Sequence, residues 1–212
     1  TPGGSQGTLL ALDKLTGKKI WQSEGWDDPA QYASVIAADH GGSRQYIQLT
    51  MKHVGGVDAK TGKALWLSDW PGRTAVIPTP IFKDGKVYVA SGYSVGCKLV
   101  ELGSSSSPTD LWSNQNMVNH HGGVILVGDH LYGYSDKGGW TCQDWKTGEL
   151  KWADKSLGKG AIHCAGGMLY LLEENSGTVV LIEASPGGWK EHGRFKLEPQ
   201  SAQRKKQGKI WT

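Results

Sequence analysis

An eleven-residue pattern that occurs three times constrains the fold of this chain more than any other feature of the sequence. The copies read ALDKLTGKKIW (11–21), GVDAKTGKALW (56–66) and CQDWKTGELKW (142–152). In each copy an aspartate precedes the final tryptophan by eight residues, and a Thr-Gly pair lies between them. Such self-similarity predicts a chain of equivalent supersecondary units. The shared residues are Asp13, Thr16, Gly17 and Trp21, then Asp58, Thr61, Gly62 and Trp66, then Asp144, Thr147, Gly148 and Trp152.

Two weaker copies complete the series. LVELGSSSSPTDLW ends at Trp112 and VLIEASPGGWKEHGRF ends at Phe195, with a glutamate in place of the aspartate. The terminal aromatic residues therefore recur with a period of about 43 residues. A second series, of tyrosines in alternating apolar segments, runs in step with the first, at positions 46, 88, 132 and 170.

Each full repeat contains four short strand signals. The first strand is an apolar run, and a Gly- or Asp-containing turn joins it to a second strand centred on Tyr. The third strand ends in the acid and the fourth ends in Trp. Four antiparallel strands per repeat predict an all-β chain folded as a β-propeller. We expect one partial propeller of about 4.5 blades over 1–212: a partial blade at 1–25, blades at 33–68, 75–114, 121–154 and 159–197, and the start of a further blade at 198–212.

Propellers close as rings, because an open stack leaves sheet faces and edges uncovered. We therefore expect missing blades outside this segment, or a second copy of the chain, to complete the ring.

The repeated residues have a structural interpretation. The acid can accept backbone N–H groups across the turn, the threonine hydroxyl can bond to the backbone, and the glycine can take φ > 0. The tryptophan, at the end of the outer strand, can lie against the neighbouring blade and donate its indole N–H there. Equivalent residues in different blades cannot form one active site, so we assign the motif to architecture.

Composition excludes several classes of function. The net charge of +3 comes from mixed signs along the chain, so nothing indicates a nucleic-acid partner. No apolar run reaches the roughly 18 residues of a membrane span. Cys97, Cys142 and Cys164 have neither disulfide nor zinc spacing, which predicts buried free thiols and no metal.

The pattern A-x-D-x-x-T-G-x-x-x-W resembles the tryptophan-docking repeat of the PQQ-like propellers, the quinoprotein alcohol dehydrogenase-like superfamily. The whole series looks most like the secreted planctomycete-type repeat proteins of that superfamily, and the resemblance implies a periplasmic or secreted location. Dehydrogenases of this superfamily carry adjacent cysteines over the quinone, a calcium ion held by Glu, Asn and Asp, and often a C-x-x-C-H haem segment. This chain has no adjacent cysteines and no C-x-x-C-H segment.

The loops between strands two and three, and those between blades, gather on one face of a propeller, where function is usually found. Here they hold His53, Tyr93, His120, His121 and Trp140. We expect the two adjacent histidines to point to opposite sides, so that one faces the channel. A metal role for it needs ligands from other blades, such as His53 or Asp28; otherwise it binds backbone groups. Trp140 either packs in its turn or is exposed and stacks on a ligand.

Two functions are compatible with these observations. The first is a non-catalytic, extracytoplasmic binding or scaffold propeller without cofactor, which uses its loop face for a protein or other ligand. The alternative is a quinone- and calcium-dependent alcohol or sugar dehydrogenase whose site lies partly outside this segment. No catalytic residue is assigned in either case.

Overall fold

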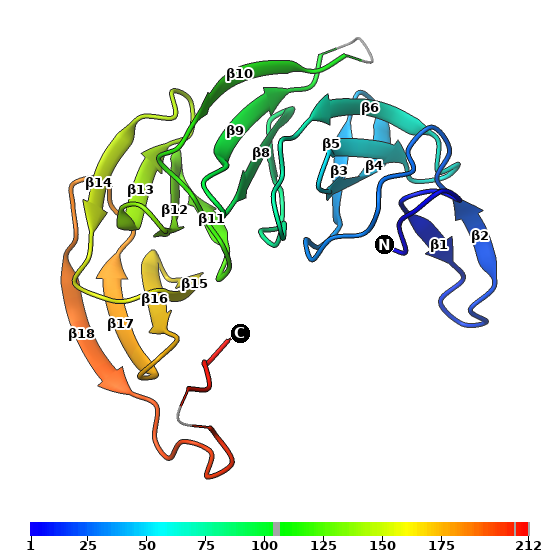
Figure 1. Cartoon of the computed structure of the whole chain (residues 1–212). Coiled ribbons are helices and arrows are strands. Elements are labelled where there is room, and N and C mark those ends of the chain that lie inside the picture. The colour runs from blue at the N-terminus through cyan, green and yellow to red at the C-terminus, as the bar shows by residue number, and fades with distance from the viewer. Residues whose placement is uncertain (104–106, 206, 212) are drawn as a thin grey trace.

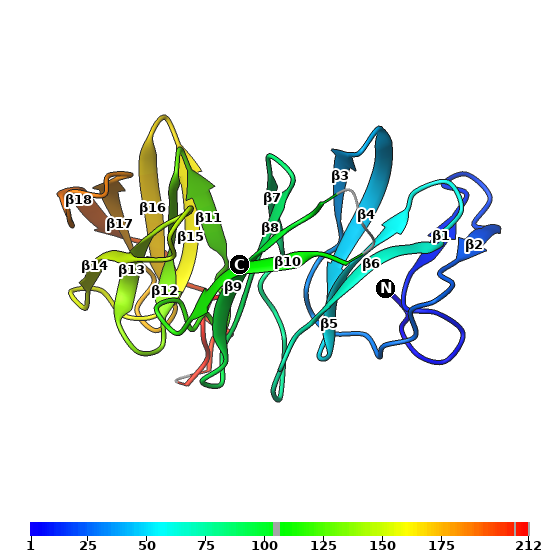
Figure 2. The ribbon, with the colours of Figure 1, turned by 90° about the horizontal axis from the view of Figure 1, so that it is seen from above.

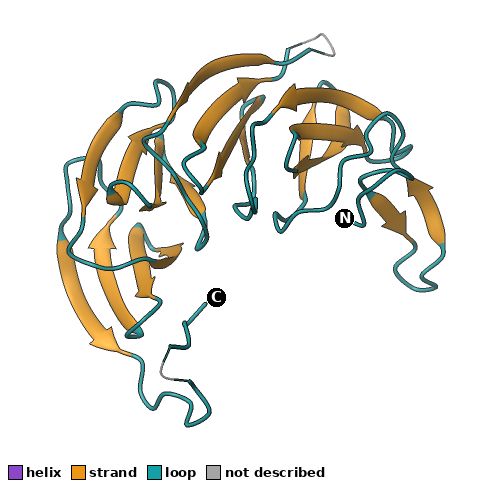
Figure 3. Ribbon diagram, viewed as in Figure 1, coloured by secondary structure: helices purple, strands orange, loops and turns teal. Residues whose placement is uncertain are grey.

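The computed structural model describes residues 1–103, 107–205 and 207–211, and its regular elements are all strands (Figures 1 and 3). Within these residues no helix is long and apolar enough to cross a membrane. The strands are β1 (Leu10–Leu12), β2 (Lys19–Gln22), β3 (Ile36–His40), β4 (Ser43–Leu49), β5 (His53–Asp58), β6 (Ala64–Asp69), β7 (Ile81–Lys83), β8 (Lys86–Ser91), β9 (Gly96–Glu101), β10 (Thr109–Asn114), β11 (Val124–Val127), β12 (His130–Ser135), β13 (Gly139–Asp144), β14 (Leu150–Asp154), β15 (Gly160–Ala165), β16 (Met168–Glu173), β17 (Thr178–Glu183) and β18 (Glu191–Lys196).

The strands form four antiparallel sheets of four strands and one sheet of two. Each four-stranded sheet is a meander in chain order, β3 to β6, β7 to β10, β11 to β14 and β15 to β18, and β1 pairs with β2. The sheets stand side by side along an open arc, with the fourth strand of each on the outside (Figures 1 and 2). The predicted all-β partial propeller is confirmed. We number the sheets as blades one (β1, β2) to five (β15 to β18).

The core lies between blades, because both faces of a middle strand are covered. Ile47 and Val54 of blade two pack with Val87 and Val100 of blade three, and all four are fully buried. Similar clusters join blades three and four, and blades four and five. This double coverage explains why middle strands such as KVYVAS (86–91) are nearly continuously apolar.

Two predicted segments differ from the structure. The blade expected at 75–114 begins its first strand only at β7, Ile81–Lys83, because Pro78 and Pro80 have no N–H to donate to the ladder. At 198–212 the described residues contain no strand. This segment instead passes along the turn between β16 and β17, where Ile210 N donates to Glu174 O at 2.7 Å.

The Thr-Gly turns have the predicted hydrogen bonds. Asp58 Oδ1 accepts from the backbone N of Lys60 at 3.0 Å and of Thr61 at 2.8 Å, and from Thr61 Oγ1 at 2.9 Å. The same three bonds occur at Asp13 and Asp144. These donors lower the pKa of Asp58, chiefly through the Thr61 backbone and hydroxyl. The turn is thus stabilised by contacts within four consecutive residues.

Three tryptophans dock on the following blade as expected. Trp21 Nε1 donates to Ala59 O at 3.1 Å, Trp112 Nε1 to Trp145 O at 3.2 Å, and Trp152 Nε1 to Ser185 O at 2.8 Å. The ring of Trp21 lies on Gly62, where an added Cβ would come within 2.5 Å of Trp21 Cε3. The glycine of the turn is therefore required for two reasons. It adopts a φ of +77°, and its lack of a side chain leaves room for the ring.

Trp66 departs from the pattern. Its indole N–H bonds at 2.6 Å to Gln45 Oε1, a buried side chain of its own blade, instead of a carbonyl of the next blade. Blade three has the longer turn of the weaker repeat, and residues 104–106 of that turn lie outside the described residues. Trp66 nevertheless packs between blades two and three. The buried Gln45 amide provides the acceptor that this indole requires.

The three cysteines are free thiols, as the spacing predicted. Cys97 and Cys142 are buried, whereas Cys164 is half-buried. Burial raises the pKa of both buried thiols, that of Cys142 to about 11. A buried thiol that is held protonated is unreactive, so these two act as small packing residues.

Candidate functional site

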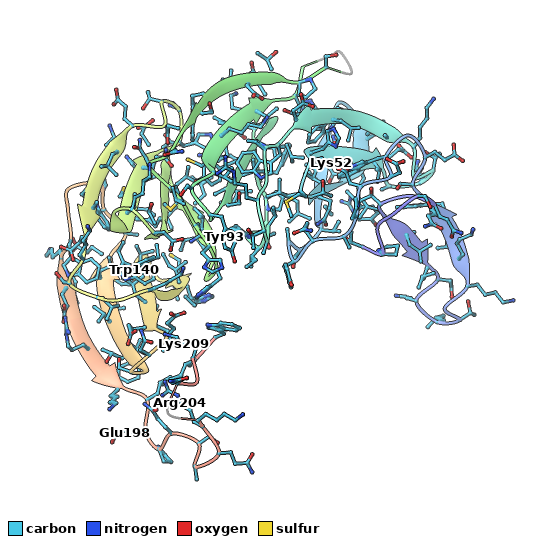
Figure 4. All side chains as sticks on the ribbon, in the orientation of Figure 1. Lys52, Tyr93, Trp140, Glu198, Arg204 and Lys209 are labelled. Carbon is cyan, nitrogen blue, oxygen red and sulfur yellow. The ribbon has the colours of Figure 1, made fainter. Side chains whose placement is uncertain are left out.

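A hollow of about 650 Å³ opens on the concave side of the arc. We call it the central hollow. Its walls come from the linkers before blades two to five, from the turns within blades three and five, and from the segment after β18. Figure 4 labels Tyr93 and Lys209 on this inner side. The lining includes Tyr32, Ala75, Ile77, Tyr93, His120, His121, Lys159, Ala161, Glu174, Lys209, Ile210 and Trp211.

Tyr93 is placed by a tight turn between β8 and β9. Tyr93 and Ser94 both have left-handed backbone, with φ of 55° and 64°. The preceding Gly92 contacts the next linker so closely that a Cβ there would lie 2.8 Å from His120 Cα. This contact fixes the turn against the linker between β10 and β11, and so sets Tyr93 beside His120.

A chain of polar contacts runs from Tyr93 across the linkers. Tyr93 Oη lies 2.8 Å from His120 Nε2, and Lys159 Nζ lies 2.8 Å from His120 Nδ1. Lys159 Nζ also donates to Asp136 Oδ1 at 2.7 Å. The chain joins the turns of blades three and four with the linkers that enter blades four and five.

These contacts determine the tautomer of His120. An ammonium group is a donor only, so Nδ1 must accept from Lys159 and carry no proton. The ring proton is then on Nε2 and is donated to the Tyr93 oxygen. Partial burial, helped by the Lys159 charge, lowers the pKa of His120. The imidazole is therefore held neutral.

A second polar group lies on the blade-five side. His121 Nε2 is 2.8 Å from Glu174 Oε2, which also accepts from Trp211 Nε1 at 3.2 Å. Lys209 Nζ is 3.3 Å from Glu174 Oε1. Burial lowers the pKa of His121, although the Glu174 charge opposes this effect. Both oxygens of Glu174 are thus occupied by groups of the protein itself.

The opposite wall of the hollow is apolar. Tyr32 and Ala75 with Ile77 come from the linkers before blades two and three, and Tyr32 N donates to Val76 O at 3.0 Å. This bond ties the two linkers together. The Tyr32 side chain is 72% exposed and Trp211 is 70% exposed, so large aromatic rings stand at two sides of the opening. Such rings provide contact area for an incoming group.

The structure brings together three of the five predicted loop-face residues, namely Tyr93, His120 and His121. The prediction that the two histidines point to opposite sides is wrong, because both line the hollow and their ring centroids are 5.3 Å apart. The strand alternation on which it rested does not apply, since β11 begins at Val124, after both residues.

Sequence reasoning missed Lys159, Glu174 and Trp211. One signal for Glu174 was available in the repeat, since Asp136 and Glu174 both follow a repeat tyrosine, at 132 and 170, by four residues. They therefore occupy equivalent turns of blades four and five. The linkers that supply Lys159 and Trp211 share no such period.

His53 belongs to a separate network. Its Nδ1 lies 2.7 Å from Asp28 Oδ2, which also accepts from Thr50 Oγ1 at 2.6 Å and Trp26 Nε1 at 2.9 Å. Asp28 is only 3% exposed, and burial, which raises its pKa, is outweighed by these three donors, so that its pKa is lowered. The network fastens the linker before blade two to the turn between β4 and β5.

The exposed position considered for Trp140 is wrong. Trp140 is 1% exposed, and Nε1 donates to Gly158 O at 3.1 Å. Its ring packs edge-on against Tyr134, with centroids 5.5 Å apart. Trp140 was assigned to the loop face, but β13 begins at Gly139, so Trp140 is a strand residue that faces blade five.

The residues of the hollow do not fit a quinone and calcium pair. Calcium requires several oxygen ligands, whereas the Glu174 carboxylate is occupied by His121, Lys209 and Trp211. In 1–103, 107–205 and 207–211 no three His, Cys, Asp or Glu side chains are grouped to hold a metal ion. Cys97 and Cys142 belong to different blades and cannot form the bridge of adjacent cysteines.

Comparisons with known proteins agree on the architecture. A model of the family described as outer membrane protein assembly factor BamB matches residues 3–154. BamB from Moraxella catarrhalis superposes with a TM-score of 0.69 at 16% identity, over 91% of this chain and 59% of that chain. No curated protein matches the sequence.

Two further solved structures share the fold. For quinohemoprotein alcohol dehydrogenase from Comamonas testosteroni the TM-score is 0.58 at 16% identity, over 96% of this chain and 42% of that chain. For the computationally designed Ika8 protein the TM-score is 0.60 at 15% identity, over 90% of this chain and 57% of that chain. The chain therefore spans under two thirds of each of these proteins, and the likenesses show the fold alone.

Proposed function

Since the chain belongs to the family of outer membrane protein assembly factor BamB, we propose that it is a non-catalytic, extracytoplasmic binding propeller. Its central hollow takes a segment of a partner protein. The family description, an assembly factor, supports a protein partner and a location outside the cytoplasm.

The observation that carries this proposal is the lining of the central hollow. One wall is apolar, with Tyr32 and Ile77, and the facing wall is polar, with Tyr93 and Lys159. Aromatic anchors beside a few convergent polar groups are typical of surfaces that bind peptides. Hydrogen bonds between the linkers tie each wall to its neighbours, as in Tyr32 N to Val76 O and in the contacts of His120 with Tyr93 and Lys159. Walls fixed in this way favour binding with little reorganisation.

The electrostatics of the hollow favour binding over proton transfer. Both ring nitrogens of His120 have protein partners, and both oxygens of Glu174 accept protein donors. A general base needs a free lone pair directed at its substrate. These two groups instead form fixed walls.

Site-specific cross-linking tests the proposal. A photoreactive amino acid at Tyr32, on the lip of the hollow, should link to a discrete partner in cells that make the protein. The same amino acid at Leu111, 41% exposed on the outer strand β10, is the matched control. Equal cross-linking at the two positions contradicts the proposal, because the hollow then has no preferred occupant.

The dehydrogenase alternative has its own assay. The protein is incubated with calcium and pyrroloquinoline quinone, and alcohols and sugars are offered with a dye as electron acceptor. We expect no stoichiometric quinone binding and no dye reduction above the rate without protein. Tight binding together with substrate-dependent reduction refutes the non-catalytic function.

A further inference from the structure

We infer that His120 is a pH-sensitive switch in the polar wall of the central hollow. In its neutral form the imidazole links the turn of blade three to the linker that enters blade five. A proton taken up on Nδ1 breaks the contact with Lys159 and leaves a positive charge on this wall. The inference concerns the protein without a ligand, so it does not depend on the proposed function.

The neutral ring connects two parts of the loop face that have separate anchors. Tyr93 belongs to the turn between β8 and β9. Lys159 belongs to the linker between β14 and β15, and its backbone oxygen accepts from Glu174 N of blade five at 2.9 Å. The side chains of Tyr93 and Lys159 meet opposite nitrogens of the His120 ring. The imidazole therefore bridges a turn of blade three and a linker held by blade five.

Protonation of His120 is incompatible with the Lys159 contact. An ammonium group only donates, so Nδ1 has to accept and carries no proton in the neutral ring. A proton on Nδ1 would place two donors and two positive charges at a contact of 2.8 Å. No hydrogen bond can then form between the two groups, and their repulsion separates them. Nε2 keeps its proton in both states, so the contact with Tyr93 persists.

Lys159 has a second partner that holds it when His120 is charged. Its ammonium group donates to Asp136 Oδ1 at 2.7 Å, in the turn between β12 and β13. Proton uptake therefore leaves two separate pairs, His120 with Tyr93 and Lys159 with Asp136. The chain of contacts parts at one defined atom, Nδ1 of His120.

The neighbouring His121 responds to acid in the opposite way. Its Nε2 lies 2.8 Å from Glu174 Oε2, so a proton on His121 strengthens a pair with a carboxylate. His121 thus keeps the linker on blade five while His120 releases Lys159. The change is therefore confined to the wall between Tyr93 and Lys159.

Burial and nearby charges set the direction of the pH dependence. Burial lowers the pKa of His120 from its ordinary value of 6.5, and the Lys159 charge adds to this effect, whereas Asp136 opposes it. The unfolded chain therefore binds this proton more readily, and the stabilisation, complete above pH of about 6.5, decreases as pH falls through the folded pKa. The titratable and charged side chains around the ring are those of Tyr93, His121, Asp136, Lys159 and Glu174, the last paired with Lys209.

Histidine titration by NMR tests the inference on the unmodified protein. Proton–nitrogen correlation spectra of the imidazole ring report which nitrogen carries the proton, and backbone spectra report on the linkers. At neutral pH we expect the His120 proton on Nε2 alone. On acidification the ring should titrate with a midpoint below 6.5, and the backbone amides of Lys159 and Gly160 should shift with the same midpoint.

Two substitutions separate the charge of the switch from its packing. In His120→Asn the amide oxygen can replace Nδ1 as the acceptor for Lys159 but takes up no proton, so the response of the Lys159 amide should disappear. Lys159→Met removes the opposing ammonium group, so the midpoint of His120 should rise by about one pH unit.

Two further variants are the matched controls. His121→Gln keeps a donor for Glu174, and Lys155→Met removes an exposed lysine of the same linker as Lys159. Both should retain the response of the Lys159 amide to acid. Thermal melts verify that each variant folds.

A His120 proton on Nδ1 at neutral pH, or a midpoint at or above 6.5, overturns the inference. So does failure of the ring to titrate before the protein unfolds in acid. A Lys159 response that persists in His120→Asn, or a midpoint that Lys159→Met leaves unchanged, has the same meaning. If a variant does not fold, the tautomer and the midpoint of the unmodified protein decide.

Discussion

The glycine four residues after the turn aspartate contacts a tryptophan of the preceding blade at Gly62 and Gly148, but not at Gly17. Gly17 and Gly62 occupy equivalent turns with φ of +70° and +77°. They differ in one respect, because Gly62 carries the ring of Trp21, whereas a Cβ added at Gly17 would have no atom within 4 Å. The pair therefore separates the cost of backbone conformation from the cost of lost contact.

Substitution by alanine should show this difference. Gly17→Ala should lower the free energy of unfolding by about 1 kcal/mol through the left-handed backbone. Gly62→Ala should cost about 1 to 3 kcal/mol more, because the methyl group displaces the Trp21 ring. Urea titrations of both variants measure the difference. Equal losses would mean that the ring moves away without cost.

Trp66 is 7% exposed and packs between blades two and three. Trp66→Ala should therefore lower the free energy of unfolding by about 3 to 5 kcal/mol, through loss of packing and an unpaired Gln45 amide. Chemical denaturation measures it. An unchanged midpoint contradicts the burial, and Trp211→Ala, at an exposed ring, provides the comparison.

Among the elements, the linkers are held in place by polar groups that hydrogen-bond to neighbouring turns, whereas the blades are held together by buried apolar side chains. Asp28 illustrates this, since one carboxylate joins the linker before blade two to Thr50 and His53 of that blade. The Tyr93, His120 and Lys159 chain does the same farther along the arc. The loop face is thus held by a few hydrogen bonds, each with a large local effect.

The Asp28 network makes stability depend on pH in the acid range. Its pKa in the folded chain lies below the ordinary value of 3.8, so the unfolded chain binds the proton more readily. The stabilisation is therefore complete above pH of about 4 and is lost as pH falls through the folded pKa. Asp28→Asn should lower the free energy of unfolding by about 1 to 3 kcal/mol at neutral pH.

The difference in unfolding free energy between the unmodified protein and Asp28→Asn should shrink as pH decreases below about 4. Urea titrations at a series of pH values measure it. Asp27→Asn, at the exposed neighbouring position, should show no such convergence. A difference that stays constant with pH excludes the carboxylate charge as its source.

The hydrogen bonds of the Thr-Gly turns could be predicted from the sequence, because each turn is closed by residues within four positions of its aspartate. The central hollow was not predictable in the same way. Lys159 and Trp211 reach it from linkers that share no period, and long-range contact decides their neighbours. Trp140 was assigned to the loop face, whereas pairing with β12 and β14 makes it part of β13.

In the molecule as a whole, the local stability of a strand depends on how far neighbouring blades bury it. Every residue of β18 is exposed, whereas β8 and β13 are buried over nearly their whole length. Phe195, in the position of the docking tryptophans, is 58% exposed. The two ends of the arc have one covered face and the middle blades have two.

Amide hydrogen exchange should follow this arrangement. In this chain, amides of β1, β2 and β18 should exchange through local opening, at rates at least about tenfold above those of β8, β9, β12 and β13. Mass spectrometry of peptic fragments measures the rates. Uniform protection along the arc would show that it opens only as a unit.

The docking of a tryptophan on the next blade's glycine also bears on how such chains change in length. Trp21 on Gly62 and Trp112 on Gly148 are the same joint made twice, each with a backbone carbonyl as acceptor. If one whole repeat is removed or duplicated, the tryptophan of one blade meets the turn glycine of a new neighbour. The same contact between blades then forms again. Gene duplication can therefore alter the number of blades without new interface chemistry, and the variable linkers on the loop face remain free to diverge.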